Sequence, residues 1–169
     1  MGYRTQFIGD LEIQPPLNDA EFSYLVAFAE SRRCRRPQGP YWVPDNPVAA
    51  DTEYDDLPDD DYNRPARGQP ELWCPWVPGS ARHLVIDSNG DGKHYAPGRW
   101  LQYLLTHFLR PGGLARGDAS GFFDDFTFDH EVVGLMAACR DDTGELWLIR
   151  PEGDVVREEV LWPGRAPDW

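Results

Sequence analysis

Cysteine is scarce in this chain, and long hydrophobic runs are absent. Its three cysteines, Cys34, Cys74 and Cys139, are an odd number without Cys-x2-Cys spacing, which argues against a disulfide framework and a cysteine zinc site. The N-terminal residues interrupt their apolar side chains with polar ones, so neither a signal peptide nor a membrane span is predicted. We therefore expect a cytoplasmic protein in a reducing compartment, with no membrane partner.

Positive charge is also scarce. The chain has 16 lysine and arginine residues against 29 acidic residues, a net charge of −13, and Lys93 is its single lysine. Direct binding to nucleic acid is disfavoured, because a phosphate backbone requires a cationic footprint on the protein. The preference for arginine over lysine is typical of a GC-rich genome.

Complete motifs for known chemistry are missing as well. The sequence contains no Gly-x-Ser-x-Gly elbow, no glycine-rich phosphate loop and no pair of histidines at zinc-binding spacing. We therefore predict no cofactor.

What the chain does have is enough apolar material for one domain. It has 169 residues, of which 41% are hydrophobic and 13% aromatic, and this suffices for a single core. We expect one domain over residues 1–169, with a long proline-rich acidic excursion at residues 37–70.

The hydrophobic pattern predicts the order of helices and strands. A capping box from Asn18 to Glu21 opens a first helix, and Pro97 opens a second that ends near residues 110–113. Strands are expected over residues 3–13, 72–77 and 83–87, and a meander of three strands over residues 126–162. The fold class is therefore α+β: a mainly antiparallel sheet with two helices packed on one face and a C-terminal three-stranded meander.

The most informative segment is residues 51–61, in which seven of eleven residues are acidic and none is basic. Unpaired carboxylates cannot be buried without a large loss of hydration. The run is therefore a solvated loop, a docking surface for a basic protein, including mimicry of nucleic-acid phosphates, or a collector of metal ions. The candidate partner-binding residues are its carboxylates and the flanking aromatic residues: Asp51, Glu53, Asp55, Asp56, Asp59, Asp60, Asp61, Tyr41, Trp42, Tyr54 and Tyr62.

Four arginines follow the first predicted helix. Guanidinium groups fit phosphate and carboxylate oxygens, so this cluster is a candidate anion site: Arg32, Arg33, Arg35 and Arg36. The competing interpretation is a solvated helix end, or internal pairing with the acidic run downstream.

Three histidines are candidate catalytic groups. Asp129 and Glu131 flank His130, while His83 and His94 lie elsewhere in the chain, and a histidine beside carboxylates can act as a general base. In an alternating segment, however, His130 shares its face with Phe126, Phe128 and Val132. That pattern is more typical of a hydrogen-bonded core histidine.

Asp87, Asn89 and Asp91 match the first half of a calcium-binding loop. Position twelve of that loop should be glutamate and is Gly98. A hairpin turn explains the same residues without a metal, so we predict no metal site.

Five segments carry a resemblance: Ile13-Gln-Pro-Pro-Leu17 with Glu21 behind it, Leu72-Trp-Cys-Pro-Trp76, Trp100-Leu-Gln-Tyr-Leu104, Phe126-Thr-Phe-Asp-His130 and Val160-Leu-Trp-Pro163. They resemble a group of small actinobacterial and phage-encoded proteins with no assigned activity. The resemblance implies origin and a single-domain architecture.

From these features we expect a non-catalytic, acidic protein-binding module that docks on a basic protein surface, such as an inhibitor, an immunity protein or an anti-defence protein. The alternative is a small hydrolase or transferase with a histidine–carboxylate site. Neutralising the acidic run should abolish binding by the module, whereas His130→Ala should inactivate the enzyme.

Overall fold

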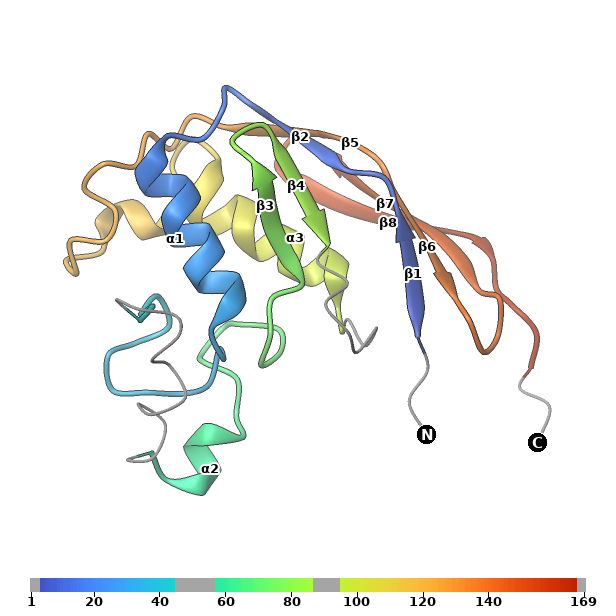
Figure 1. The fold of residues 1–169 in the computed structure, drawn as a ribbon, viewed down its shortest axis with the longest axis horizontal. Coiled ribbons are helices and arrows are strands. Elements are labelled where there is room, and N and C mark those ends of the chain that lie inside the picture. The colour runs from blue at the N-terminus through green and yellow to red at the C-terminus, as the bar shows by residue number, and fades with distance from the viewer. Residues whose placement is uncertain (1–3, 45–56, 87–94, 167–169) are drawn as a thin grey trace.

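The computed structural model describes residues 4–44, 57–86 and 95–166, and Figure 1 shows their arrangement. The fold is α+β and the sheets are antiparallel. The elements are β1 Thr5–Ile8, β2 Leu11–Gln14, α1 Asp19–Glu30, α2 Asp59–Tyr62, β3 Trp76–Ser80, β4 His83–Ile86, α3 Pro97–Leu104, the π-helix η2 Leu105–Leu109, the 3-10 helix η3 Leu114–Gly117, β5 Glu131–Gly134, β6 Met136–Arg140, β7 Leu146–Glu152 and β8 Val155–Trp162.

Two sheets grow from one long pair of strands. The N-terminal strands pair with β5 and β6 in a single register, from Thr5 opposite Arg140 to Gln14 opposite Glu131. The pairing is interrupted at Gly9 and Asp10, between the pairs Ile8–Ala137 and Leu11–Gly134. Gly9 and Gly134 have φ angles of +118° and +123°, where residues with a side chain are strained. On one side of the interruption the strands form a sheet of order β1-β6-β7-β8. On the other side they form a second sheet of order β3-β4-β2-β5. The predicted C-terminal meander is confirmed as β6, β7 and β8.

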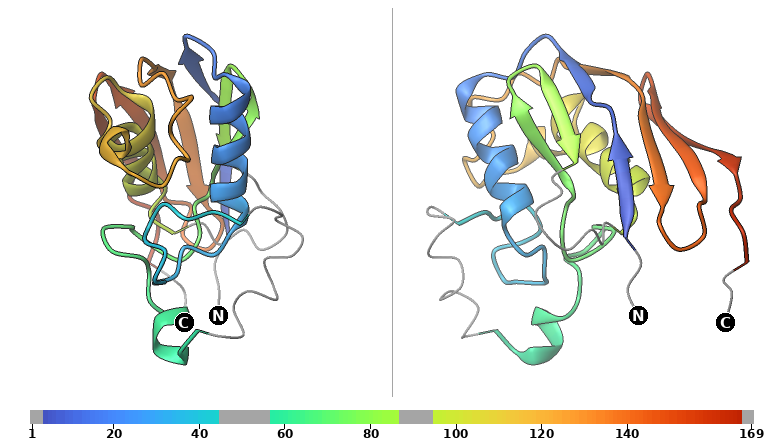
Figure 2. Two further views of the ribbon diagram at one scale, coloured as in Figure 1. Left: turned by 90° about the vertical axis from the view of Figure 1, so that its left-hand side faces the viewer. Right: turned by 45° about the vertical axis from the view of Figure 1, so that its right-hand side comes forward.

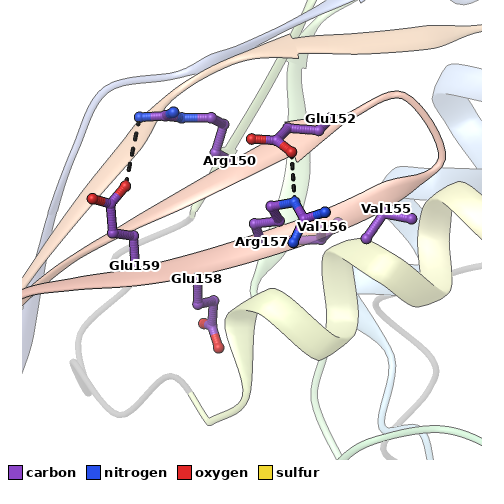
Figure 3. A pocket seen from close by; sticks show the side chains of 7 residues that line it. All are labelled: Arg150, Glu152, Val155, Val156, Arg157, Glu158 and Glu159. Carbon is purple, nitrogen blue, oxygen red and sulfur yellow. Dashed lines mark hydrogen bonds and ion pairs between the residues drawn. The ribbon is translucent and has the colours of Figure 1, made fainter.

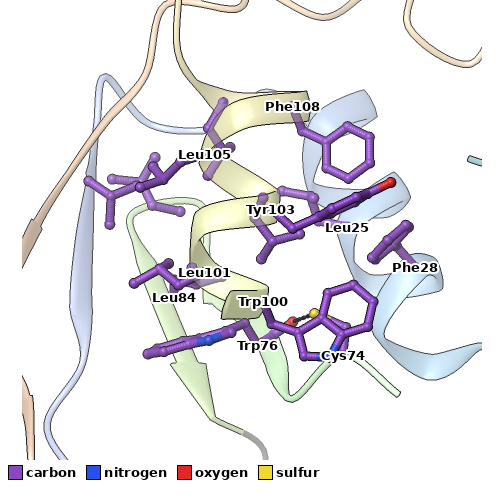
Figure 4. Packing of buried hydrophobic residues seen from close by; sticks show 14 of the residues in the cluster. Leu25, Phe28, Cys74, Trp76, Leu84, Trp100, Leu101, Tyr103, Leu105 and Phe108 are labelled. Atoms are coloured by element: carbon purple, nitrogen blue, oxygen red, sulfur yellow. Dashed lines mark hydrogen bonds between the residues drawn. The ribbon is translucent and has the colours of Figure 1, made fainter. Parts of the chain in front are cut away.

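One hydrophobic core joins both sheets and both long helices (Figure 4). Trp100 and Leu101 of α3 are fully buried, and α3 contacts β3 of one sheet and β8 of the other. Phe28 of α1 packs edge-on against Trp100 and Phe108, with ring centroids 6.0 and 5.2 Å apart. Burial of such large rings is the main driving force for this packing. Both helices therefore cover the inner side of the bent sheet pair.

Some predicted boundaries are wrong. The expected strand over 72–77 begins only at Trp76, because Pro75 cannot donate a hydrogen bond to a ladder. Residues 126–130 are not a strand, although their exposure alternates as predicted: Phe126, Phe128 and His130 are buried, and the residues between them are exposed.

The excursion is fastened to the body in its described parts. An isolated bridge joins Cys34 to Pro65. Around it, the amide of Arg35 donates to Arg64 O at 2.8 Å, and the amide of Ala66 donates to Arg33 O at the same distance. The short helix α2 lies beyond this anchor and projects away from both sheets in each view of Figures 1 and 2. Among the described residues, no helix has the length and apolarity needed to span a bilayer.

The close approach at Gly9 generates the first prediction. A Cβ atom there would lie 2.6 Å from the carbonyl oxygen of Leu135, and the backbone φ is already unfavourable for alanine. We expect Gly9→Ala to lower the free energy of unfolding by roughly 2–3 kcal/mol in urea titration. Gly117→Ala is the matched control, since no atom lies within 4 Å of its added Cβ. Equal midpoints for the two variants would contradict this account.

Candidate functional site

The described part of the acidic run forms α2. Asp59 and Asp60 are exposed and Asp61 is half-buried, and no ion pair involves these three residues within the described ranges. Their charges therefore face solvent without compensation. The other predicted residues of the run, Asp51, Glu53, Tyr54, Asp55 and Asp56, lie outside the described residues.

The described aromatic residues beside the run pack on their own chain. The hydroxyl of Tyr41 lies 2.6 Å from Nδ1 of His107. The guanidinium of Arg36 lies over the Trp42 ring, 4.2 Å from its centroid. The guanidinium of Arg32 lies over the Tyr62 ring, 4.1 Å from its centroid. All three aromatic residues are half-buried. The more exposed aromatic residues lie elsewhere and were not identified from sequence: Trp73, Tyr95 and Trp162, each about half exposed.

The arginine cluster divides into an internal and an external pair. Arg32 donates from Nε to Tyr62 O at 3.0 Å, and Arg33 is 1% exposed. Arg35 and Arg36 instead line a cavity of about 550 Å³ together with Arg67. Sequence reasoning missed Arg67, because it lies 31 residues beyond Arg36 and no local pattern links them.

Arg33 is a buried cation without a carboxylate partner in the described structure. One guanidinium nitrogen donates to Trp42 O, and the group lies over the Phe28 ring at 4.3 Å. Its Nε and Nη1 atoms have no hydrogen-bond partner among the described residues. The pKa of Arg33 is lowered to about 10, chiefly by burial; the charge of Tyr24 opposes the shift and the nearby charge of Arg36 contributes to it.

His130 is part of a buried hydrogen-bonded network. Its Nδ1 lies 2.7 Å from the carbonyl of Pro15, which can only accept, so Nδ1 carries a proton. Nε2 faces Oε2 of Glu21 at 3.0 Å and Oγ1 of Thr127 at 3.1 Å. Both ring nitrogens are engaged inside the fold.

Glu21 is the centre of the network. Its side chain is 1% exposed and accepts from the amides of Asn18 at 2.8 Å and Thr127 at 2.7 Å, and from the Thr127 hydroxyl at 2.8 Å. Burial alone would raise the pKa of Glu21, but these donors outweigh it and the pKa is lowered. The capping residue of α1 thus also holds residues 127–130 in place.

A cavity of about 380 Å³ lies beside this network. Its charged lining residues are Arg110, Asp129, His130, Glu131 and Asp154. Arg110 lies 3.7 Å from Asp154. The site therefore places a histidine and several carboxylates together, although the histidine nitrogens point to internal partners.

The remaining predicted sites are dispersed. His83 is exposed, with Nε2 3.6 Å from Asp10, and shares a hydrogen bond of 3.1 Å with Ser80. His94 and the calcium candidates Asp87, Asn89 and Asp91 lie outside the described residues. Within the ranges that are described, no group of three or more His, Cys, Asp or Glu side chains is arranged to hold a metal ion.

A further cavity, of about 400 Å³, lies on the β7–β8 hairpin (Figure 3). Its two arginines are each paired with a glutamate: Arg150 lies 3.9 Å from Glu159, and Arg157 donates to Glu152. Both cations of this cavity are therefore paired, and Glu158 is the additional carboxylate of its lining. Glu158 instead points toward the start of α3, and burial raises its pKa against a hydrogen bond from the Gly98 backbone.

His107 is the histidine whose surroundings shift its titration most clearly. Its ring stacks on Tyr103 with centroids 3.9 Å apart. Burial lowers the pKa of His107 to about 4, and the charge of Arg110 adds to the shift. The native protein therefore holds His107 neutral at pH 7.

Replacement of Glu21 tests the network. Glu21→Gln removes a buried acceptor that receives four donors, and we expect it to lower the free energy of unfolding at pH 7 by about 3 kcal/mol. Because the native pKa of Glu21 is depressed, its contribution is present above its ordinary pKa of 4.5 and is lost as the pH falls through the native value. Urea titrations at pH 7 and pH 3.5 should show the gap between wild type and variant narrowing. A gap that does not change with pH would contradict this role.

The state of His107 generates a separate pH prediction. The unfolded chain binds a proton near pH 6.5 and the native chain only near pH 4, so stability falls as the pH is lowered between these values. His107→Gln should flatten this part of the curve of unfolding free energy against pH. A wild-type slope retained in His107→Gln would refute the assignment.

The functional candidates rest on this geometry alone. Comparison of the chain with protein families, curated proteins and solved structures gives no match.

Proposed function

We propose that the protein is a non-catalytic binding module that docks on a basic surface of another protein through α2 and the acidic run to which it belongs. The observation that carries this proposal is the absence of compensation at α2. None of its three carboxylates forms an ion pair in the described structure, although six arginines lie between residues 32 and 67.

The base of α2 supports the same function. The segment that follows α2 is fixed to the end of α1 by the Cys34–Pro65 bridge and by Arg32, which donates to Tyr62 O. Carboxylates held on an anchored element lose less freedom on binding than those of a flexible loop. They can also present to a cationic groove the charge that a phosphate backbone would present. The association should therefore be fast and sensitive to salt.

A second candidate is an enzyme with a histidine–carboxylate site, and the cavity beside His130 favours it. The geometry of the hydrogen bonds around His130 argues against that function. In a nucleophile–base–acid arrangement, the hydroxyl and the orienting carboxylate contact opposite ring nitrogens. Here Thr127 and Glu21 both face Nε2, and Nδ1 is bonded to a carbonyl.

Neutralising α2 tests the binding function. The triple variant Asp59→Asn, Asp60→Asn, Asp61→Asn and the wild type should be immobilised and compared in capture from a bacterial lysate, at low and at 0.5 M salt. We expect a basic protein to be retained by the wild type at low salt and its retention to fall at least about tenfold in the variant, because the attractive field is removed.

The matched control neutralises three exposed carboxylates elsewhere: Asp124→Asn, Asp125→Asn and Glu131→Gln. It makes the same change in net charge and should retain the partner. Equal retention by both triple variants and the wild type would contradict docking through α2. Loss in both would assign binding to net charge rather than to this surface.

A further inference from the structure

The outer face of the sheet β1-β6-β7-β8 is apolar and exposed. Residues directly opposite each other in antiparallel strands share a face of the sheet. The register sets two rows of side chains on this face: Ile8, Ala137 and Leu148 in the first, and Gln6, Cys139, Leu146 and Trp162 in the second. Ile8 is 72% exposed and Trp162 is 54% exposed. The opposite face of the same strands carries Met136 and Ile149, which are buried in the core.

The sequence of these strands is typical of strands that are covered on both faces. β7 begins with four consecutive apolar residues, Leu146–Ile149, and β8 ends with another apolar run, Val160–Trp162. Of the nine large apolar side chains that are exposed in the described ranges, five belong to β1 and β8. The end of this sheet at the β6–β7 turn extends beyond both long helices in Figure 1 and in the right-hand view of Figure 2. Such a concentration of exposed apolar groups marks an interaction surface.

The relief of the face suits a second sheet of the same kind. Ala137 lies between Ile8 and Leu148, so a small side chain separates two large ones along the first row. Alternation of large and small side chains allows two packed sheets to interdigitate. A two-fold axis would bring identical rows together, with large side chains of one copy over Ala137 of the other.

The charges at the border of the face favour the same partner. Two copies of a chain with net charge −13 repel each other, so they associate best where charge is compensated locally. At this border, Arg150 lies 3.9 Å from Glu159, and Arg157 donates to Glu152. Approach of two copies is therefore less costly here than at an acidic surface such as α2.

We propose that this face is the interface of a homodimer, in which a second copy of the chain packs its own β1-β6-β7-β8 sheet against it. With four strands about 4.8 Å apart, the face covers roughly 400 Å². Two such faces bury less than the ~1,600 Å² of a standard interface, which corresponds to a weak and reversible dimer. This inference does not rest on docking through α2.

Sedimentation velocity of the full chain over about 1–500 µM tests the proposal, and we expect a dissociation constant on the order of 10–100 µM. The double variant Ile8→Glu, Trp162→Glu should raise this constant at least about a hundredfold, because the two-fold axis brings four carboxylates into an apolar interface. The milder variant Ile8→Thr, Trp162→Thr keeps residue types that favour strands and should raise it about tenfold. Its melting temperature at about 1 µM, where monomer prevails, should equal that of the wild type.

The matched control is Trp73→Glu, Leu114→Glu. It also replaces one exposed tryptophan and one exposed aliphatic side chain with carboxylates, but outside this sheet, and it should dimerise like the wild type. The proposal fails if the wild type stays monomeric at about 500 µM, or if the two glutamate variants behave alike. A monomeric wild type that sediments with phosphatidylcholine vesicles would assign the face to a lipid surface and would likewise overturn the dimer.

Salt separates this association from docking through α2. Screening weakens the repulsion between two acidic copies, so the dimer should tighten as sodium chloride is raised to about 0.5 M, whereas docking on a basic protein should weaken. Neutralising the three carboxylates of α2 should leave the dimer in place. A dimer that dissociates as salt is raised would be held by charge attraction and would contradict the proposal.

Discussion

The fold depends on one buried carboxylate. Glu21 completes the capping box of α1. The same two oxygens accept from Thr127 and lie beside Nε2 of His130, whose Nδ1 donates to the carbonyl of Pro15. A carboxylate at this depth is costly unless every lone pair is used. Its donors come from the entry to α1 and from the approach to β5, and His130 in turn donates to Pro15 just after β2. These three segments must therefore all be in place together.

Charge is distributed unevenly in the rest of the molecule. Arg32, Arg33 and Arg36 lie over aromatic rings and donate to backbone carbonyls, which stabilises the end of α1 and the excursion. The carboxylates of α2 are thereby left for solvent or for a partner. Arg35 and Arg67 keep their charge facing outward in the same region. Exposed groups of both charges therefore belong to the end of α1 and to the excursion anchored there.

Sequence reasoning was most successful where the interaction is local. The capping box from Asn18 to Glu21 is confirmed by both of its hydrogen bonds, because all its atoms lie within one helical turn. The alternation around His130 likewise predicted which side chains are buried. The same alternation did not predict that residues 126–130 form no strand. Pairing in a sheet depends on where the partner strand ends, and this is not encoded in the segment itself.

The contacts that build the sites were beyond such reasoning. Glu21 bonds to Thr127 across 106 positions, and Arg67 joins Arg35 and Arg36 only because the Cys34–Pro65 bridge returns the chain to the end of α1. Nothing in the local pattern distinguishes Tyr41, which turns inward to His107, from an exposed anchor. Local composition indicates which groups are available, and tertiary topology decides which of them meet.

The pairing of residues 5–14 with residues 131–140 also determines when the protein can fold during its synthesis. β1 and β2 are synthesised well before their partners β6 and β5, so the central ladder cannot close until residues 131–140 have been translated. Contacts of such long range fold slowly, and unpaired strand edges in an incomplete chain favour aggregation. A nascent chain of this protein thus leaves β1 and β2 accessible to chaperones and proteases until β5 and β6 have been synthesised.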